Sequence, residues 1–287
     1  MFQFYRGQKT AHGGPIPGMP EPFDIAMLEI DFAELSDPGR VRVDNEDYLG
    51  HVAPETPERA QSHGWLFAVA DGVGGHEKGE VASRTAIEAL LDGFRGAAKA
   101  EPLSGLLQNL VRRANTRVLD AGMNSGMATT LVVCALRYDR VVVAHVGDSR
   151  CYLIRQKEAT LLTRDHTVAG EHVRLGLLSA DEVADAETRH ILSRSLGTGL
   201  SVNAEINDHQ VFPGDVLLLC SDGLHGALSL GDIAGVVSGA ENLDVAARKL
   251  VMLANDRDGS DNVTAQLIGV QNVERVGMYR GRPYKLR

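Results

Sequence analysis

Apolar residues gather in short uninterrupted runs along much of this chain. The runs at 66–70 and 216–220 contain no charged residue and are too short for typical helices, so they predict strands that are buried on both faces. Segments 128–138 and 141–146 flank a short turn and predict a buried antiparallel hairpin. Further strands are expected at 151–155, 159–162, 204–211 and 263–270. The chain is therefore expected to contain a large amount of buried sheet.

Two helical stripes lie between the first predicted strand and the hairpin. Residues 78–98 place Val81, Ala86 and Leu90 on one face, and residues 102–122 begin with a proline and end with a glycine, as helices commonly do. Shorter helices are expected at 229–237 and 244–254. Doubly buried strands beside paired helices favour stacked sheets covered by helices, but this periodicity leaves the number of layers open.

An acidic residue lies at or beside the end of several predicted strands. Asp71 and Asp222 each follow a buried run, and Glu46, Asp47 and Asp261 flank other strand ends. A carboxylate in such a place is partly dehydrated, which is unfavourable unless a cation lies beside it. The five side chains offer only oxygen ligands, which suit Mg²⁺ or Mn²⁺ better than zinc or copper. Two such metals can lower the pKa of a water between them and direct it at phosphorus.

Composition favours one soluble enzyme domain. A chain of 287 residues can bury a large core, and the three cysteines lack the Cys-x-x-Cys spacing, so we expect buried reduced thiols. The net charge of −9 argues against nucleic acid as a partner. No apolar stretch reaches the roughly 18 residues of a membrane helix. The first nine residues lack the apolar region of a signal peptide, so we expect a cytoplasmic protein.

Five short motifs occur in a characteristic order: 42–47 (RVDNED), 69–75 (VADGVGG), 145–150 (HVGDSR), 220–223 (CSDG) and 260–262 (SDN). One Asp-Gly pair alone is more often a turn than a ligand. All five in this order resemble the metal-dependent protein serine/threonine phosphatases of the PPM/PP2C family, in its bacterial branch. The resemblance spans about residues 28–270, and it implies an α+β fold: a four-layer α-β-β-α sandwich of two largely antiparallel sheets flanked by helices.

The resemblance also implies a role for each acidic residue. Asp71 would bridge two Mn²⁺ or Mg²⁺ ions, with the Gly72 carbonyl on one of them. Asp222 and Asp261 would complete the second ion, and Asp148 with Asp222 would hold a third, weaker one. Glu46 and Asp47 would act largely through waters. Arg42 would hold the phosphate, because its planar fork can engage two phosphate oxygens. A water or hydroxide between the metals would then displace the serine or threonine of a phosphoprotein.

Several of these roles have structural alternatives that the sequence leaves open. Asp148 could instead cap the hairpin turn, and Arg42 could be a surface arginine of a strand. Eukaryotic relatives carry a histidine as the third residue of the Asp-Gly motif, where this chain has Val73. His76 lies nearby as a candidate general acid, although a surface or helix-capping histidine is the better interpretation.

We divide the chain into an irregular N-terminal extension (1–27), a phosphatase domain (28–270) and a basic C-terminal tail (271–287) that is either solvated or docks an acidic partner. Within the domain, residues 163–197 resemble the flap of the family, although an ordinary helical connection would have the same composition. The expected partners are phosphorylated proteins, including a serine/threonine kinase or its substrates. Two alternative functions remain: a phosphoprotein-binding module without turnover, and a phosphatase of a small phosphorylated metabolite.

Overall fold

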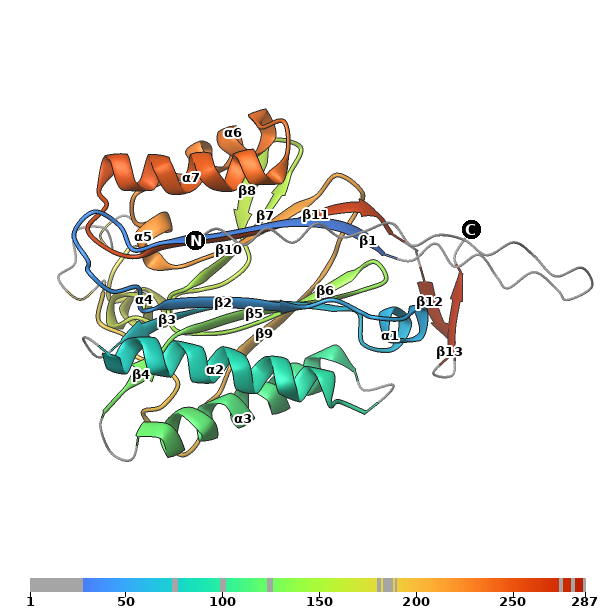
Figure 1. Ribbon diagram of the computed structural model, residues 1–287, viewed down its shortest axis with the longest axis horizontal. Helices are drawn as coiled ribbons and strands as arrows, with labels where there is room; N and C mark the ends of the chain where they lie inside the picture. Colours follow the sequence, from blue (N-terminus) through green and yellow to red (C-terminus); the bar gives the residue numbers. More distant parts are fainter. Residues whose placement is uncertain are drawn as a thin grey trace, which may run out of the picture.

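Two antiparallel sheets stacked face to face form the centre of the molecule, and helices cover their outer faces (Figure 1). The computed structural model describes residues 28–73, 77–98, 102–122, 126–179, 182, 188, 190–273, 276–279 and 282–285. The first sheet has the order β1 (Glu29–Asp37), β11 (Val263–Asn272), β10 (Val216–Cys220), β7 (Arg150–Arg155) and β8 (Glu158–Leu161). The second has the order β2 (Asp47–Val52), β3 (Trp65–Val73), β5 (Leu131–Arg137), β6 (Arg140–Val146) and β9 (Glu205–Gln210), with β4 (Ala128–Thr129) beside β3.

Each sheet has its own pair of covering helices. The helices α2 (Glu77–Arg95) and α3 (Leu103–Gly122) pack on the second sheet, and α6 (Leu230–Gly239) and α7 (Leu243–Arg257) pack on the first (Figure 1). This arrangement confirms the four-layer sandwich. The short helices α1 (Pro57–Ser62), α4 (Val168–Arg174) and α5 (Asp222–His225) lie in connections between strands and helices.

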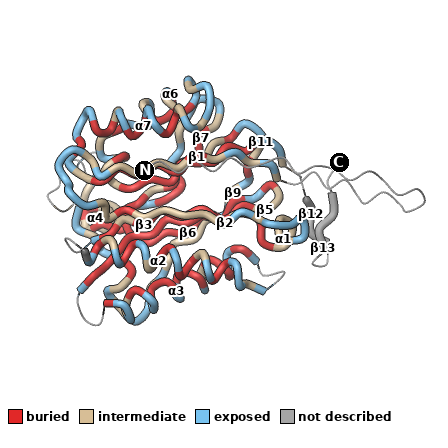
Figure 2. Tube along the Cα trace, in the orientation of Figure 1, coloured by how far each residue is buried: buried red, intermediate tan, exposed pale blue. Residues whose placement is uncertain are grey.

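The apolar runs are uninterrupted because both faces of their strands are buried (Figure 2). In β3, Leu66, Ala68 and Ala70 face α2 and α3, whereas Phe67 and Val69 face the other sheet. The run at 216–220 behaves in the same way in β10, since alternate residues contribute to the inter-sheet core and to the core beneath α6 and α7. Each strand therefore contributes to two cores, which explains why no polar residue interrupts it.

The predicted hairpin is present as β5 and β6, and all three cysteines are buried free thiols as expected. One predicted helix face is wrong at a single residue: Val81 of α2 is 42% exposed, whereas Ile87 is fully buried. The basic tail contains a two-stranded hairpin, β12 (Val276–Tyr279) with β13 (Arg282–Lys285), that the sequence did not predict. Within the described residues, no helix is both long and apolar enough to span a membrane.

Candidate metal and phosphate site

The predicted acidic residues converge at one end of the sandwich, where α5 and the connections from β2, β3 and β11 meet (Figure 1). Asp47 opens β2 and is paired in register with Asp71 near the end of β3. Burial is the main reason why the pKa of Asp71 lies well above its usual range, and the charges of Asp47 and Asp222 add to the rise. The two adjacent strands thus bring two carboxylates together that repel each other when both are ionised.

The carboxylate of Asp47 connects the two sheets. Its Oδ2 accepts hydrogen bonds from the Ser221 hydroxyl at 2.6 Å and from the Thr264 hydroxyl at 2.7 Å, both on the first sheet's side of the site. Its Oδ1 is buried and has no hydrogen-bond partner among the described residues. Burial raises the pKa of Asp47 to about 7 despite the two hydroxyl donors. An acceptor oxygen left in this state suits a water or cation in the cleft.

Glycine at position 72 allows the backbone of β3 to approach the start of α2. A Cβ atom on Gly72 would lie 2.1 Å from the carbonyl oxygen of Gly79, and the Gly72 N–H donates to the Glu46 carbonyl at 3.1 Å. Gly79 in turn lies against the Glu46 side chain, because a Cβ there would be 2.6 Å from its Cδ. Any larger residue at position 72 would push these backbones apart, and Glu46 would move with them.

Asp222 and Asp261 come from the first sheet's side of the site. Asp222 follows Ser221, the residue before α5, and burial together with the charge of Asp261 raises its pKa. The charge of His190, which lies in the segment predicted to be the flap, acts in the opposite direction on the same carboxylate. A Cβ on Gly223 would lie 2.2 Å from the Asn262 carbonyl oxygen, so the two acidic segments are in close backbone contact.

Asn262 fixes the loop that carries Arg42. Its amide nitrogen donates to the carbonyls of Pro38 and Asp44, both at 3.0 Å, and its Oδ1 accepts from the Glu46 N–H at 2.8 Å. Both polar atoms of the Asn262 side chain are used in these hydrogen bonds. One neutral side chain thereby holds both ends of the loop between β1 and β2 against the segment that carries Asp261.

Arg42 lies on the exposed loop between β1 and β2. Its Nη2 donates to Asp261 Oδ2 at 2.9 Å, which places a guanidinium at the edge of the acid cluster. The Arg42 side chain is 48% exposed, so this ion pair is open to solvent. Val41 and Val43 on either side of it are 70% and 93% exposed. The arginine is not part of a strand, which answers one of the structural alternatives.

Asp148 occupies the turn between β6 and β7, and it is 7% exposed. Burial, with the charges of Asp222 and Asp165, raises its pKa to about 7. His225 of α5 contacts the Asp148 carbonyl at 3.0 Å, so this turn is tied to the helix that carries Asp222. Neither this His225 contact nor the hydrogen bond from Thr264 to Asp47 could be predicted from the sequence, because each joins segments that are far apart in the chain.

The predicted residues that the structure describes fit a site for hard divalent cations. Asp47, Asp71, Asp148 and Asp222 are carboxylates whose pKa values are raised by burial and by one another, and one of them keeps an unpartnered oxygen. The ionised forms require positive charge in the cleft, and the donor atoms are all oxygen. His76 lies outside the described residues, so its predicted role has no structural counterpart here.

Comparison with known proteins agrees with this geometry. The family model for protein phosphatase 2C matches residues 45–257. The chain belongs to the protein phosphatase 2C family. A serine/threonine phosphatase from Listeria innocua is 32% identical over 254 residues, covering 86% of this chain and 96% of that protein. The protein phosphatase PhpP of Streptococcus pneumoniae is 31% identical over 247 residues, covering 82% and 96%.

Solved structures of serine/threonine phosphatases have the same fold. The enzyme from S. agalactiae has a TM-score of 0.78 at 32% identity, covering 85% of this chain and all of that one. The Mycobacterium tuberculosis phosphatase PstP has a TM-score of 0.73 at 32% identity, covering 85% and 99%. A PstP catalytic domain with two manganese ions has a TM-score of 0.72, with the same identity and coverage. This chain is thus a serine/threonine phosphatase that acts on phosphoproteins, and neither a binding module nor a metabolite phosphatase gains support.

Proposed function

We propose that Asp71, the Gly72 carbonyl, Asp222 and Asp261 would hold two Mn²⁺ or Mg²⁺ ions, with Asp71 as the residue common to both, the Gly72 carbonyl serving one ion and Asp222 and Asp261 the other. Glu46 and Asp47 act through waters, which suits the unpartnered buried oxygen of Asp47. Asp148 and Asp222 hold a third ion more weakly. The observation that carries the proposal is the convergence of carboxylates whose pKa values are raised by burial first and by mutual repulsion second. The two manganese ions in PstP give an independent parallel.

Bound ions of this kind supply a water of lowered pKa and polarise the phosphoryl oxygens. The protein's own contribution is to position the groups around them. Arg42 binds two oxygens of the phosphate through its planar fork, and its hydrogen bond to Asp261 uses only one of the five N–H donors of the guanidinium. Its side chain is open to solvent and therefore to the phosphate. Asp47, held by Ser221 and Thr264 at 2.6 and 2.7 Å, keeps a fixed acceptor on the opposite wall.

We further propose that the substrates are the products of a serine/threonine kinase in the cytoplasm. Exposed valines at positions 41 and 43 flank the phosphate-binding arginine, and apolar residues there suit a polypeptide better than a small metabolite. The buried free thiols of Cys134, Cys151 and Cys220 agree with a reducing compartment. We assign the catalytic domain to residues 28–270, and the matched range of the family model lies within it.

The test is phosphate release from a phosphothreonine peptide while Mn²⁺ is varied. Asp222→Asn keeps the shape of the side chain but removes its charge, and we expect turnover to fall by at least about a hundredfold. Asp208→Asn, at an exposed position on β9, is the matched control and should leave turnover unchanged. Arg42→Lys should raise KM for the peptide without changing the Mn²⁺ requirement, because a lysine offers only a point charge. Metal-independent turnover, or full activity of Asp222→Asn, would overturn the proposal.

A further inference from the structure

A cavity of about 190 Å³ lies between the start of the flap and β9. Three arginines line it, Arg164, Arg174 and Arg194, together with Glu171 and Glu205. None of these residues belongs to the acid cluster. The cavity is therefore a separate, strongly polar feature of the same face of the protein, and its chemistry has no role in the hydrolytic site described above.

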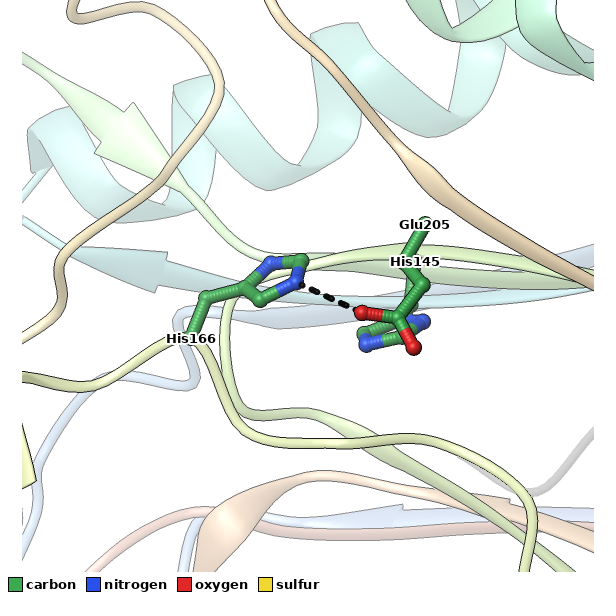
Figure 3. A group of neighbouring side chains, drawn as sticks. All are labelled: His145, His166 and Glu205. Carbon is green, nitrogen blue, oxygen red and sulfur yellow. Dashed lines mark ion pairs between the residues drawn. The ribbon is translucent and has the colours of Figure 1, made fainter. Parts of the chain in front are cut away.

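One wall of the cavity contains a group with the composition of a metal site. Donor atoms of His145, His166 and Glu205 lie within 4.8 Å of one another (Figure 3). The hydrogen bonds argue against a metal there. Arg164 Nη2 lies 3.0 Å from both oxygens of Glu205, and the Gly147 N–H donates to Nδ1 of His166 at 3.3 Å. Nε2 of His166 lies 3.7 Å from Glu205 Oε2 and 3.5 Å from Nη1 of Arg194, so an arginine already occupies this side of the ring.

This wall instead holds an arginine in place. Burial lowers the pKa of His166 to about 4, so the ring is neutral near pH 7 and adds no charge to the cavity. Glu205 positions the Arg164 guanidinium through two equal contacts, and the Arg164 carbonyl lies 2.8 Å from Nε2 of His145. The backbone carbonyl and the guanidinium of Arg164 are therefore both held, and its side chain is 59% exposed.

Among the described residues, the guanidinium groups that line the cavity outnumber the carboxylates that pair with them. Glu171 serves two arginines at once, with contacts of 2.6 Å to Arg174 and 2.9 Å to Arg194, while Glu205 serves Arg164. Asp165 also lines the cavity, but Arg150 occupies both of its oxygens at 2.8 and 2.6 Å. The lining thus has one positive charge more than its own carboxylates neutralise, in a protein whose net charge is −9.

The cavity is rigidly connected to the hydrolytic centre. The His166 N–H donates to the Gly147 carbonyl at 3.0 Å, next to Asp148 in the chain. Arg150, two residues beyond Asp148, forms the paired hydrogen bonds to Asp165. An anion bound among the arginines would therefore sit at a constant offset from the phosphoryl group under attack.

We propose that this arginine cavity binds an anionic side chain of the phosphoprotein substrate, close in sequence to the phosphorylated residue. The ligand is a carboxylate or a second phosphate, and the arginine fork suits either. This inference rests on the proposed function, since it adds a specificity site to the same hydrolytic centre. An acidic substrate would be repelled by the acid cluster, and the positively charged cavity beside that cluster would offset the repulsion.

The experiment compares phosphothreonine peptides in which one glutamine is replaced by glutamate or phosphoserine and moved residue by residue along both flanks. Loss of phosphate from the threonine alone is followed by mass spectrometry, because phosphoserine is itself a substrate of this enzyme. At the best position we expect kcat/KM to rise about three- to fivefold over the glutamine peptide, the size of one partly exposed ion pair. Phosphoserine exceeding glutamate would identify a phosphate as the ligand, and the reverse would identify a carboxylate. The preference should weaken as salt is added.

Two variants change the cavity charge in opposite directions. Arg174→Gln removes the excess charge and should abolish the preference, whereas Glu171→Gln frees two guanidiniums and should increase it. Arg140→Gln, an exposed arginine paired with Asp208 at the opposite end of β6, is the matched control and should retain the preference. p-Nitrophenyl phosphate cannot reach the cavity, so its turnover should be the same in all three.

A preference that is missing at every position, or that survives Arg174→Gln, would overturn the cavity assignment while leaving hydrolysis intact. Failure of the proposed function would look different, because no substrate would then be turned over with Mn²⁺. In that event, fluorescence anisotropy of the labelled peptides still tests the cavity. Tighter binding of the acidic peptide, lost in Arg174→Gln, would support it, and equal binding would reject it.

Discussion

Removal of one buried charge should make the metal-free enzyme more stable. Asp148 is 7% exposed, and its pKa rises from an ordinary value of 3.8 to about 7 because of burial and the neighbouring charges of Asp222 and Asp165. A folded-state pKa above the unfolded-state value means that ionisation opposes folding. The stabilising contribution of the protonated carboxyl is complete below pH 3.8 and is lost as the pH rises to about 7.

The size of this effect follows from the two pKa values. Each pH unit between them corresponds to about 1.4 kcal/mol, so the loss reaches about 4 kcal/mol above pH 7. Water that enters the cluster and rearrangement of neighbouring charges reduce this figure, and we expect about 2 to 4 kcal/mol. Asp148→Asn cannot ionise and should escape the loss. In metal-free buffer the variant should therefore be about as stable as the natural chain near pH 4 and clearly more stable at pH 8.

Urea unfolding in the presence of EDTA at several pH values measures this gap directly, provided the slope with urea is the same for both proteins. Asp208→Asn, at an exposed position on β9, is the control and should show no gap that grows with pH. Addition of Mn²⁺ should reverse the order, because the natural chain binds the ion with one more ligand. The reasoning is refuted if Asp148→Asn is less stable than the natural chain at pH 8 without metal, or if the gap does not change with pH.

Two other substitutions test how the site is held. Gly72→Ala should lower the free energy of unfolding by at least about 3 kcal/mol and remove most activity, since the new Cβ would lie 2.1 Å from a carbonyl oxygen of α2. Its control is Gly105→Ala in α3, which has open space around it and should be neutral or slightly stabilising. Thr264→Val removes a donor to Asp47 and should raise the Mn²⁺ concentration for half-maximal activity about tenfold, whereas Thr116→Val on exposed helix surface should not. An unchanged Mn²⁺ requirement for Thr264→Val would show that the tether does not support the ions.

The sequence predicted the strand ends and their acids because both leave a local mark. A run buried on both faces has no polar residue, so the first acid after it, such as Asp71 or Asp222, marks the point where the strand leaves the core. The buried faces of the helices were predicted less accurately. Val81 lies on the predicted apolar face of α2 but is 42% exposed, because the curvature and position of the sheet beneath decide which part of a wide stripe is covered.

Contacts between the sheets could not be predicted in the same way. Thr264 and Ser221 bind Asp47 only because the start of β11, the end of β10 and the start of β2 lie at the same level in two different sheets. That alignment depends on strand register and on how the sheets stack. The arginine cavity has the same origin. Its residues come from the start of the flap, α4, the segment after it and β9, and only the folded chain shows that two of its arginines share Glu171.

The acid cluster is held together chiefly by groups that carry no charge. Asn262 donates to the carbonyls of Pro38 and Asp44 and accepts from the Glu46 N–H, so it fixes the loops on both sides of Arg42 and beside Asp261. Hydroxyls from Ser221 and Thr264 do the same for Asp47. Neutral clamps of this kind keep like charges close without neutralising them. The remaining repulsion between the carboxylates lowers the stability of the metal-free fold. Divalent cations remove this repulsion when they bind, so binding stabilises the fold.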